Sequence, residues 1–279
     1  MIINYTHFSI THIPIGREFG MKASIIIPAY QTERFISETI ESVIGQSMGP
    51  FDSVQVVVVS DGCDKSFLAA SRYSSEISGI LLEENSGVYN ARNVALSHCL
   101  TSSDIVGVID SDDVWGSGRF LATKRAMKKY PNLTAFTCAF QNIAEDGSLL
   151  GTPGRRINAG QLLYTSDIVK RLGMFKPWRC AADTEYLKRA EMIGARYRFV
   201  DGAMFYRRRH PNQLTQRPDT GLVSSLRKEY SEAIEVMVAS GKEPTFEVYD
   251  LPNVAETFGE LPPAENTYSK MFKLSAKPS

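Results

Sequence analysis

Three aspartates lie within four residues of one another, directly after a short apolar run of the chain. Residues Ile105–Ile109 are typical of a buried strand, and Asp110, Asp112 and Asp113 follow it. Carboxylates this close repel one another, so a cation is expected among them. Oxygen ligands without a thiolate or imidazole suit Mg²⁺ or Mn²⁺ held together with phosphate oxygens. An acidic turn that caps a helix is the alternative, but the apolar strand before the aspartates and the tryptophan after them favour the metal site.

Two other polar loops also follow predicted strands. The tripeptide Pro28-Ala29-Tyr30 ends the run Ser24–Ile27, and Asp61 follows the run Val54–Val59. Neighbouring parallel strands place such loops side by side at the ligand-binding edge of a sheet. There an aromatic ring could stack on a base and a carboxylate could accept a hydrogen bond from its ring N–H. Taken singly, each loop is equally typical of a plain strand exit or turn.

Basic residues occur at two further positions of this kind. Gly87 opens a predicted helix with Arg92 one turn inside it, and a second basic segment, Arg207–Thr215, contains His210. Helix N-termini and arginine side chains both favour phosphate, and the basic segment could neutralise a diphosphate. A solvated helix face and a solvated charge run are the respective alternatives.

A further carboxylate begins a later helix. Asp183 stands at the start of the predicted helix Asp183–Met192. It could simply cap that helix. A carboxylate at a helix start that faces the ligand edge of a sheet is also well placed to act as a general base.

Short apolar runs alternate with amphipathic stretches from Ala23 to about Ile109, which predicts a doubly wound α/β half with a parallel sheet covered on both faces. The helices predicted there are Glu33–Gln46, Lys65–Ser75 and Val88–Cys99, and the third strand is Gly79–Leu82. The second half is less regular. Its predicted elements are helices Phe120–Tyr130, Gln161–Leu172 and Leu222–Ala239, strands Leu133–Phe140 and Tyr197–Tyr206, a hairpin turn at Glu145-Asp146-Gly147, and an irregular tail.

The composition of the chain excludes several function classes. Its 279 residues are 43% hydrophobic, and 31 Lys+Arg balance 31 Asp+Glu, which argues against bulk electrostatic binding of nucleic acid. Its four cysteines form no CxxC pair, as expected of reduced thiols in a cytoplasmic protein. No apolar run approaches the ~18 residues of a membrane span, and the first twenty residues do not have the pattern of a signal peptide.

Taken together and in order, these segments resemble the family 2 glycosyltransferases with the GT-A fold. The resemblance covers about residues 22 to 215. It is carried by the segments Ser24–Tyr30, Asn85–Asn93, Asp110–Asp113, Arg171–Phe175 with Asp183, Glu185 and Arg189, and Tyr206–His210. Two departures stand out. Ser60 and Ala182 occupy positions where the family usually has acidic residues, which leaves Asp61 and Asp183 as the aligned carboxylates.

The resemblance implies a Rossmann-like, mostly parallel sheet. It also implies metal-dependent, inverting transfer of a hexosyl or N-acetylhexosaminyl group to an acceptor hydroxyl, with a UDP-sugar as the expected donor. The roles implied are assigned residue by residue. The metal ligands would be Asp110, Asp112 and Asp113; the general base would be Asp183; and the nucleotide and diphosphate would contact Pro28, Ala29, Tyr30, Asp61, Gly87, Arg92, Asp110, Ser111, Arg209 and His210.

The resemblance also implies how the chain is organised. Residues 1–20 form an N-terminal extension, 21–217 the glycosyltransferase domain, and 218–279 a helical or irregular extension. Within the domain, 21–115 bind the nucleotide and 116–217 the acceptor. The expected partners are a nucleotide sugar and a glycan, lipid-linked or other hydroxyl acceptor in envelope polysaccharide or glycoconjugate synthesis, and no nucleic acid. Peripheral contact with the inner face of the plasma membrane and a homodimer are left open.

Two alternatives from other classes are distinguishable. A nucleotidyltransferase shares a related sheet and acidic site, but it normally carries a Gly-rich basic loop after the first strand, where this chain has Pro28-Ala29-Tyr30. A sugar-nucleotide-binding subunit without activity is suggested by Ala182. Metal-dependent hydrolysis of UDP-sugars would separate such a subunit from an enzyme.

Overall fold

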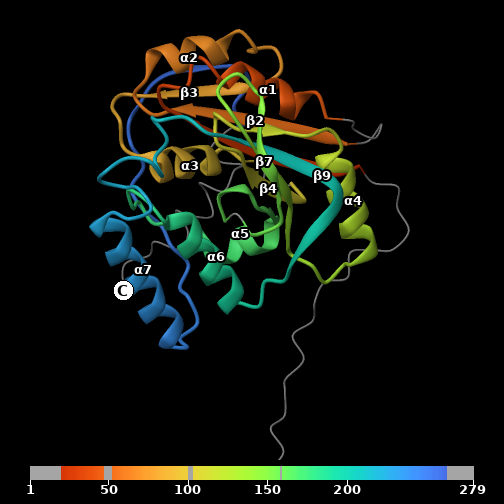
Figure 1. The fold of residues 1–279 in the computed structure, drawn as a ribbon, viewed down its shortest axis with the longest axis vertical. Coiled ribbons are helices and arrows are strands. Elements are labelled where there is room, and N and C mark those ends of the chain that lie inside the picture. The colour runs from red at the N-terminus through yellow and green to blue at the C-terminus, as the bar shows by residue number, and fades with distance from the viewer. Residues whose placement is uncertain (1–19, 47–51, 100–102, 158, 263–279) are drawn as a thin grey trace, which may run out of the picture.

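The computed structural model of the chain describes residues 20–46, 52–99, 103–157 and 159–262 (Figure 1). The predicted N-terminal extension therefore lies almost wholly outside the described residues, as do the last residues of the C-terminal extension. None of the described helices is both long and apolar enough to cross a bilayer.

Four parallel strands form the centre of the sheet. In spatial order they are β3 (Ser78–Leu82), β2 (Ser53–Ser60), β1 (Lys22–Ala29) and β4 (Ile105–Val108). Their buried positions are largely valine and isoleucine, which pack well on a sheet that is covered on both faces. The α/β sheet predicted for the first half is confirmed, and the loops after β1, β2 and β4 open at one common edge.

Three helices cover the two faces of this parallel centre. Helix α1 (Ile36–Ile44) and helix α2 (Asp64–Ser71) pack on one face, and helix α3 (Val88–Ser97) packs on the other (Figure 1). Helix α1 buries Ile36, Ile40 and Val43 because their spacing places them on one stripe. The connection from each strand to its helix therefore always crosses the edge at which the polar loops gather.

Beyond β4 the sheet is mixed rather than mostly parallel. Strand β8 (Leu163–Thr165) is antiparallel to both β4 and β6 (Ala135–Ile143), whereas β6 runs parallel to β9 (Tyr197–Arg208). The two remaining strands of this half, β5 (Val114–Trp115) and β7 (Leu149–Gly154), pair antiparallel with β9 and β6. The turn from β6 to β7 is too short for a parallel crossover, which needs a dozen or more residues.

The second half also supplies helices to both faces of the sheet. They are α4 (Arg119–Lys129), α5 (Ser166–Leu172), α6 (Ala182–Met192) and α7 (Ser225–Ala239), with a 3₁₀ turn at Ala159–Gln161. The predicted helix Gln161–Leu172 is wrong in its first part, because Leu163–Thr165 form β8 and the helix begins only at Ser166. A short apolar run does not by itself distinguish a buried strand from a buried helix.

The tail was predicted to be irregular, which is wrong for one segment. Strand β10 (Val254–Phe258) extends the sheet by pairing antiparallel with β3. Most of its side chains are exposed, so it lacks the apolar alternation that identifies a strand. Phe258 is its anchor, with its ring centroid 5.1 Å from that of Phe67 and its ring edge against Gly79.

Candidate active site

A cavity of about 330 Å³ opens at the edge where β1, β2 and β4 end. Every site residue predicted from the sequence lies in its lining, including Pro28, Ala29 and Ser111. The lining also contains residues to which the sequence analysis assigned no individual role. These are Gln31, Thr32, Asn85, Val88, Tyr89, Arg179, Arg207, Asn212, Gln213, Leu214, Thr215, Arg217, Thr220 and Arg227. Many of them belong to the segment after β9, which closes one side of the cavity and of which the sequence singled out only the first part, up to Thr215, as a basic segment.

Arg92 and Asp110 form the central ion pair of the cavity. Arg92 Nη2 lies 2.7 Å from Asp110 Oδ1, and the arginine side chain is only 4% exposed. Its guanidinium packs 5.1 Å from the ring centroid of Tyr89 and 5.7 Å from that of Phe175. Its Nε and Nη1 atoms are buried and make no hydrogen bond within the described structure. Burial, the largest single effect, would lower the pKa of Arg92, but Asp110, Tyr89 and Asp183 together outweigh it and the pKa is raised.

The pKa of the Asp110 carboxyl is raised as well, which disfavours its charged form. Burial, followed by the nearby Asp112 and Asp183 carboxylates, raises its pKa to about 6 although Arg92 opposes this shift. The Asp112 and Asp183 carboxylates thus both act on Asp110. A divalent cation would relieve such crowding of acidic oxygens.

Asp112, two residues after Asp110 in the same loop, also lines the cavity. Its Oδ2 lies 2.8 Å from Nε2 of His210, whose ring packs 5.2 Å from the ring of Phe35. The imidazole of His210 and the carboxylates of Asp110 and Asp112 thus all belong to the cavity lining. In the described part of the chain, however, no three acidic, histidine or cysteine side chains are arranged to hold a metal ion by themselves.

Asp113 differs from the other two aspartates because it is buried and already satisfied. Its Oδ1 accepts from the backbone N–H of Arg208 at 3.0 Å, and its Oδ2 accepts from Gln161 Nε2 at 2.9 Å. Burial, then Asp112 and Asp110, raises the pKa of Asp113 well above its usual value. Its carboxylate supports the loop from behind, and its place among the metal ligands stays a prediction.

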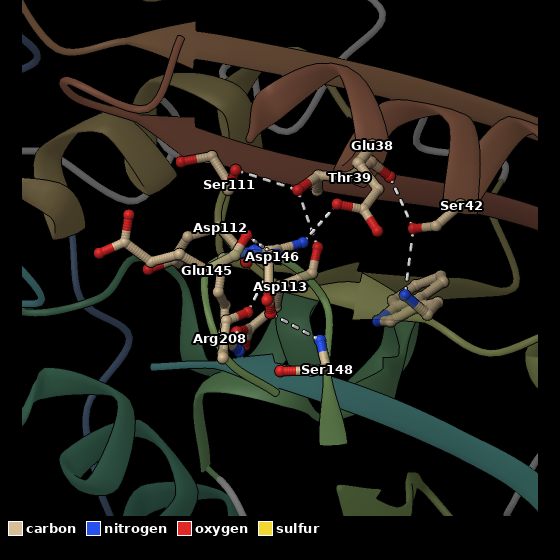
Figure 2. A network of polar contacts seen from close by, with 12 residues as sticks. Glu38, Thr39, Ser42, Ser111, Asp112, Asp113, Glu145, Asp146, Ser148 and Arg208 are labelled. Carbon is tan, nitrogen blue, oxygen red and sulfur yellow. Dashed lines mark hydrogen bonds and ion pairs between the residues drawn. The ribbon is translucent and has the colours of Figure 1, made fainter. Parts of the chain in front are cut away.

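The buried side chain of Arg208, at the end of β9, links the aspartate loop to the β6–β7 turn and to α1 (Figure 2). Its Nε donates to the Asp112 carbonyl at 3.1 Å, and its Nη1 donates to the carbonyls of Glu145 at 2.7 Å and Ala144 at 3.2 Å. Its Nη2 forms an ion pair with Glu38 of α1. Sequence reasoning missed this role, because a run of three arginines after a strand does not reveal which one is buried.

The loops at the other end of the cavity are joined through Asp61. Its two carboxylate oxygens accept from the backbone N–H groups of Ser86 and Gly87, at 2.7 and 2.9 Å. Burial raises the pKa of Asp61, although both of these hydrogen bonds oppose that shift. Gly87 has a φ of 96°, which favours glycine, and it leads directly into α3. Asp61 therefore shapes the loop beside the half-buried Tyr30, and its contact with a base stays a prediction.

Asp183 lies in the first turn of α6 and lines the cavity. The hydroxyl of Tyr89 donates to its Oδ1 at 2.9 Å. The residue at the cap position is Ala181, with φ 64° and no capping side chain, so Asp183 is not the helix cap. By contrast, Glu185 is buried away from the cavity and pairs with Arg189 at 2.8 Å. Among the acidic residues of α6, the cavity lining contains Asp183 alone.

The comparisons with known proteins agree with this geometry. Residues 24–179 match the family described as "Glycosyl transferase family 2". The chain is 36% identical over 97 residues to the minor teichoic acid biosynthesis protein GgaA of Bacillus subtilis (strain 168), covering 33% of this chain and 22% of GgaA. It is 30% identical over 148 residues to the putative teichuronic acid biosynthesis glycosyltransferase TuaG of the same organism, covering 53% of this chain and 56% of TuaG. A further relative, the minor teichoic acid biosynthesis protein GgaB, is matched over only 12% of its length. The chain thus spans less than a quarter of GgaA and of GgaB.

Two solved structures share the fold. S. aureus TarS, residues 1–349, superposes with a TM-score of 0.59 at 20% identity, covering 79% of this chain and 65% of that one. The mannosyltransferase PcManGT from Pyrobaculum calidifontis, in complex with GDP-Man and Mn²⁺, superposes with a TM-score of 0.60 at 18% identity, covering 93% and 70%. These likenesses show that the sheet and its helices have the GT-A architecture.

Proposed function

Because this chain belongs to glycosyl transferase family 2, we propose that it moves a sugar from a nucleoside-diphosphate sugar to an acceptor hydroxyl with inversion at the anomeric carbon. One observation carries the proposal. The carboxylates of Asp110, Asp112 and Asp183 and the cations of Arg92 and Arg209 converge on one cavity. The family match favours this function over nucleotidyl transfer.

The acidic end of the cavity fits a divalent cation that is shared with the donor. Asp110 and Asp112 offer carboxylate oxygens to the cavity, and among the described residues no complete set of protein ligands surrounds them. Mg²⁺, and Mn²⁺ by analogy, is typically bound through one or two carboxylates together with substrate phosphates. We assign these two residues as ligands, with Asp113 in support. The cation would neutralise charge on the departing diphosphate.

The basic side chains of the cavity bind and orient the same diphosphate. Arg92 is held between aromatic rings, and Arg209 and His210 approach from the segment after β9. Cations aimed at the leaving group stabilise the negative charge that builds up as the sugar departs. Tyr30 and Asp61 line the part of the cavity assigned to the base, which we take to be uracil.

Asp183 is the proposed general base. Its carboxylate faces the cavity, and the Tyr89 hydroxyl donates a hydrogen bond that holds one oxygen in place. The free oxygen would accept the proton of the acceptor hydroxyl as that hydroxyl attacks the anomeric carbon from the face opposite the diphosphate. A single base that acts in one displacement gives inversion.

We further propose that the acceptor is a glycan or polyol polymer of the cell envelope, and that the reaction takes place on the cytoplasmic side. GgaA, GgaB and TuaG are named for teichoic and teichuronic acid synthesis, which supports an envelope polymer. TarS has been solved with UDP and with UDP-GlcNAc, which supports a UDP-sugar donor. The four cysteines are free thiols, as suits a reducing compartment.

The proposal is tested by separating donor binding from turnover. We expect UDP to bind the wild type in a Mn²⁺-dependent manner in calorimetric titrations, and the protein to release UDP from UDP-sugars. Asp183→Asn should keep UDP affinity within about twofold and lose roughly 10²- to 10⁴-fold in turnover, because the base acts only on the acceptor. Asp112→Ala should lose the metal-dependent part of UDP binding.

The matched control is Asp146→Asn, which changes an exposed carboxylate in the β6–β7 turn outside the cavity. This variant should match the wild type in both assays. Equal loss of UDP affinity in Asp183→Asn and Asp112→Ala would contradict the assignment of Asp183 as base. Absence of UDP binding by the wild type would contradict the proposed donor.

A further inference from the structure

Some arginines in and near the cavity pair with an acid, whereas others, including Arg217 and Arg227 of its lining, have no such ion pair in the described structure. Arg92, Arg179 and Arg208 each form an ion pair with an aspartate or glutamate. Within the described residues, no carboxylate pairs with Arg156, Arg207 or Arg209. Arg207 Nε instead donates to the neutral Asn142 side chain, at 2.9 Å.

These three unpaired cations lie close together. The guanidinium groups of Arg156 and Arg207 lie against the same ring, 5.3 and 4.7 Å from the centroid of Phe140. Burial lowers the pKa of Arg207, and the charges of Arg209 and Arg156 lower it further. The nearby Asp113 carboxylate acts in the opposite direction but does not outweigh these effects. The protein therefore tolerates repulsion here that a bound anion would relieve.

The donor diphosphate does not account for all of this charge. The proposed function assigns Arg92, Arg209 and His210 to the diphosphate, which leaves Arg156 and Arg207 in excess. Arg207 lines the cavity, whereas Arg156 is exposed and lies outside its lining. The pair therefore runs from the cavity that holds Asp183 outward to the surface.

We propose that Arg156 and Arg207 bind an oxyanion of the acceptor, a phosphodiester or a carboxylate close to the hydroxyl that is glycosylated. This inference rests on the proposed function and narrows its acceptor to an anionic polymer. Guanidinium groups bind phosphate and carboxylate through paired N–H donors, and Phe140 holds both groups in place. An uncharged acceptor would leave the two cations facing each other without a counter-ion.

An anion near this pair could also belong to the donor, as the carboxylate of a uronic acid. The position of Arg156 favours the acceptor. A donor sugar lies inside the cavity, between the diphosphate and Asp183, whereas Arg156 lies beyond the cavity lining. An acceptor polymer reaches the cavity from outside, where an exposed cation such as Arg156 is available to it.

The test uses glycerol 3-phosphate as a probe for the acceptor phosphate. The full chain is saturated with UDP and Mg²⁺, and the probe is titrated by saturation-transfer NMR, which suits weak ligands. Arg156→Gln and Arg207→Gln should each weaken probe binding by about tenfold, the effect of one charge-assisted hydrogen bond. UDP affinity should stay within about twofold in both variants.

Arg155→Gln is the matched control, because Arg155 is the neighbouring exposed arginine but pairs with Asp201 at 3.4 Å. It should leave probe binding unchanged. Arg207→Lys keeps the charge and should retain part of the binding, which separates recognition from folding damage.

Three results distinguish the possibilities. Unchanged probe binding in the Arg156→Gln/Arg207→Gln double variant would overturn the inference. Weaker binding of UDP-glucuronate, with UDP-glucose and the probe unaffected, would also overturn it and place the anion on the donor sugar. If UDP fails to bind the wild type, the proposed function fails, while titration of the free protein with the probe still reports on the arginine pair.

Discussion

The two halves of the sheet meet at the cavity but are built in different ways. In the parallel half, β1, β2 and β3 are each followed in the chain by a helix that packs back on the sheet. In β8-β6-β9-β5 the neighbours are joined by long-range pairings, such as Val114 with Tyr206. The loops of the parallel half lie at the ends of consecutive strand–helix units, whereas the site residues of the mixed half are positioned by pairings between strands far apart in the chain.

Contacts between the aspartate loop and β9 make that connection. Asp113 accepts from the backbone of Arg208, and the Arg208 side chain returns to the Asp112 carbonyl. The segment that carries Arg209 and His210 starts at this same point. The position of the proposed diphosphate-binding residues therefore depends on these contacts between Arg208 and the aspartate loop, which lie next to the proposed metal site.

The substitution expected to disturb these contacts most is Arg208→Ala. This buried cation has one acidic partner and three carbonyl acceptors, so we expect a loss of about 3 kcal/mol in unfolding free energy. The aspartate loop and the segment after β9 would also lose their common support, and metal-dependent UDP affinity should fall. Urea denaturation and calorimetry measure the two effects.

Glu38→Gln is the matched test of the partner side chain. The Glu38 side chain is 54% exposed, so its loss should cost no more than about 1 kcal/mol. Equal destabilisation by the two substitutions would mean that the ion pair, and not the carbonyl contacts, fixes the loop. Arg208→Lys should fall between them and guards against an alanine variant that does not fold.

At the outer edge of the parallel half, β10 is held against β3 by Phe258. Phe258→Ala removes the ring that anchors β10 against Phe67 and Gly79, and it should cost about 2 kcal/mol because the ring is only partly buried. UDP affinity should not change, since β10 contributes nothing to the cavity lining. Val254→Ala, at an exposed position of the same strand, should have no measurable effect. A loss of UDP affinity in Phe258→Ala would show that the edge supports the site after all.

The sequence predicted the parallel half and its site loops well because both signals are local there. Valine and isoleucine runs that end in polar loops identify β1, β2 and β4, and the carboxyl ends of parallel strands must meet. The residues named from those loops all line the cavity. Their separate roles stay predictions, since hydrogen bonding inside the protein engages some of them, as with Asp61.

The mixed half was harder to predict for a physical reason. Strand β5 has two residues and β8 has three, which is too short for any periodicity to appear. Strand β10 is recognised only by its pairing with β3, which its own side chains do not indicate. Arg208 is identified by its acceptors, and these come from residues up to 170 positions away along the chain.

A smaller effect should follow from Thr39→Val in α1. The buried Thr39 hydroxyl lies 3.0 Å from the carbonyl of Ser111 and 2.7 Å from that of Asp113. Valine has the same shape but leaves both carbonyls without this donor, so we expect a loss of about 1 to 2 kcal/mol by urea denaturation. Ser71→Ala removes an exposed hydroxyl from α2 and should change stability little. If the two variants behave alike, α1 does not support the aspartate loop from within the parallel half.

The smallest effect expected is a pH dependence that arises in the parallel half alone. Burial raises the pKa of Asp61 on folding, against its two backbone donors. A carboxyl with a raised folded pKa binds its proton more tightly in the folded state, so its contribution to stability is present at acid pH. That contribution is lost as the pH rises from the unfolded value, about 3.9, through the folded pKa. The unfolding free energy of the wild type relative to Asp61→Asn, measured in urea at several values between about pH 4 and 7, should therefore decrease with pH. An increase would mean that the ionised carboxylate is the better acceptor for Ser86 and Gly87, and that hydrogen bonding outweighs burial at this loop.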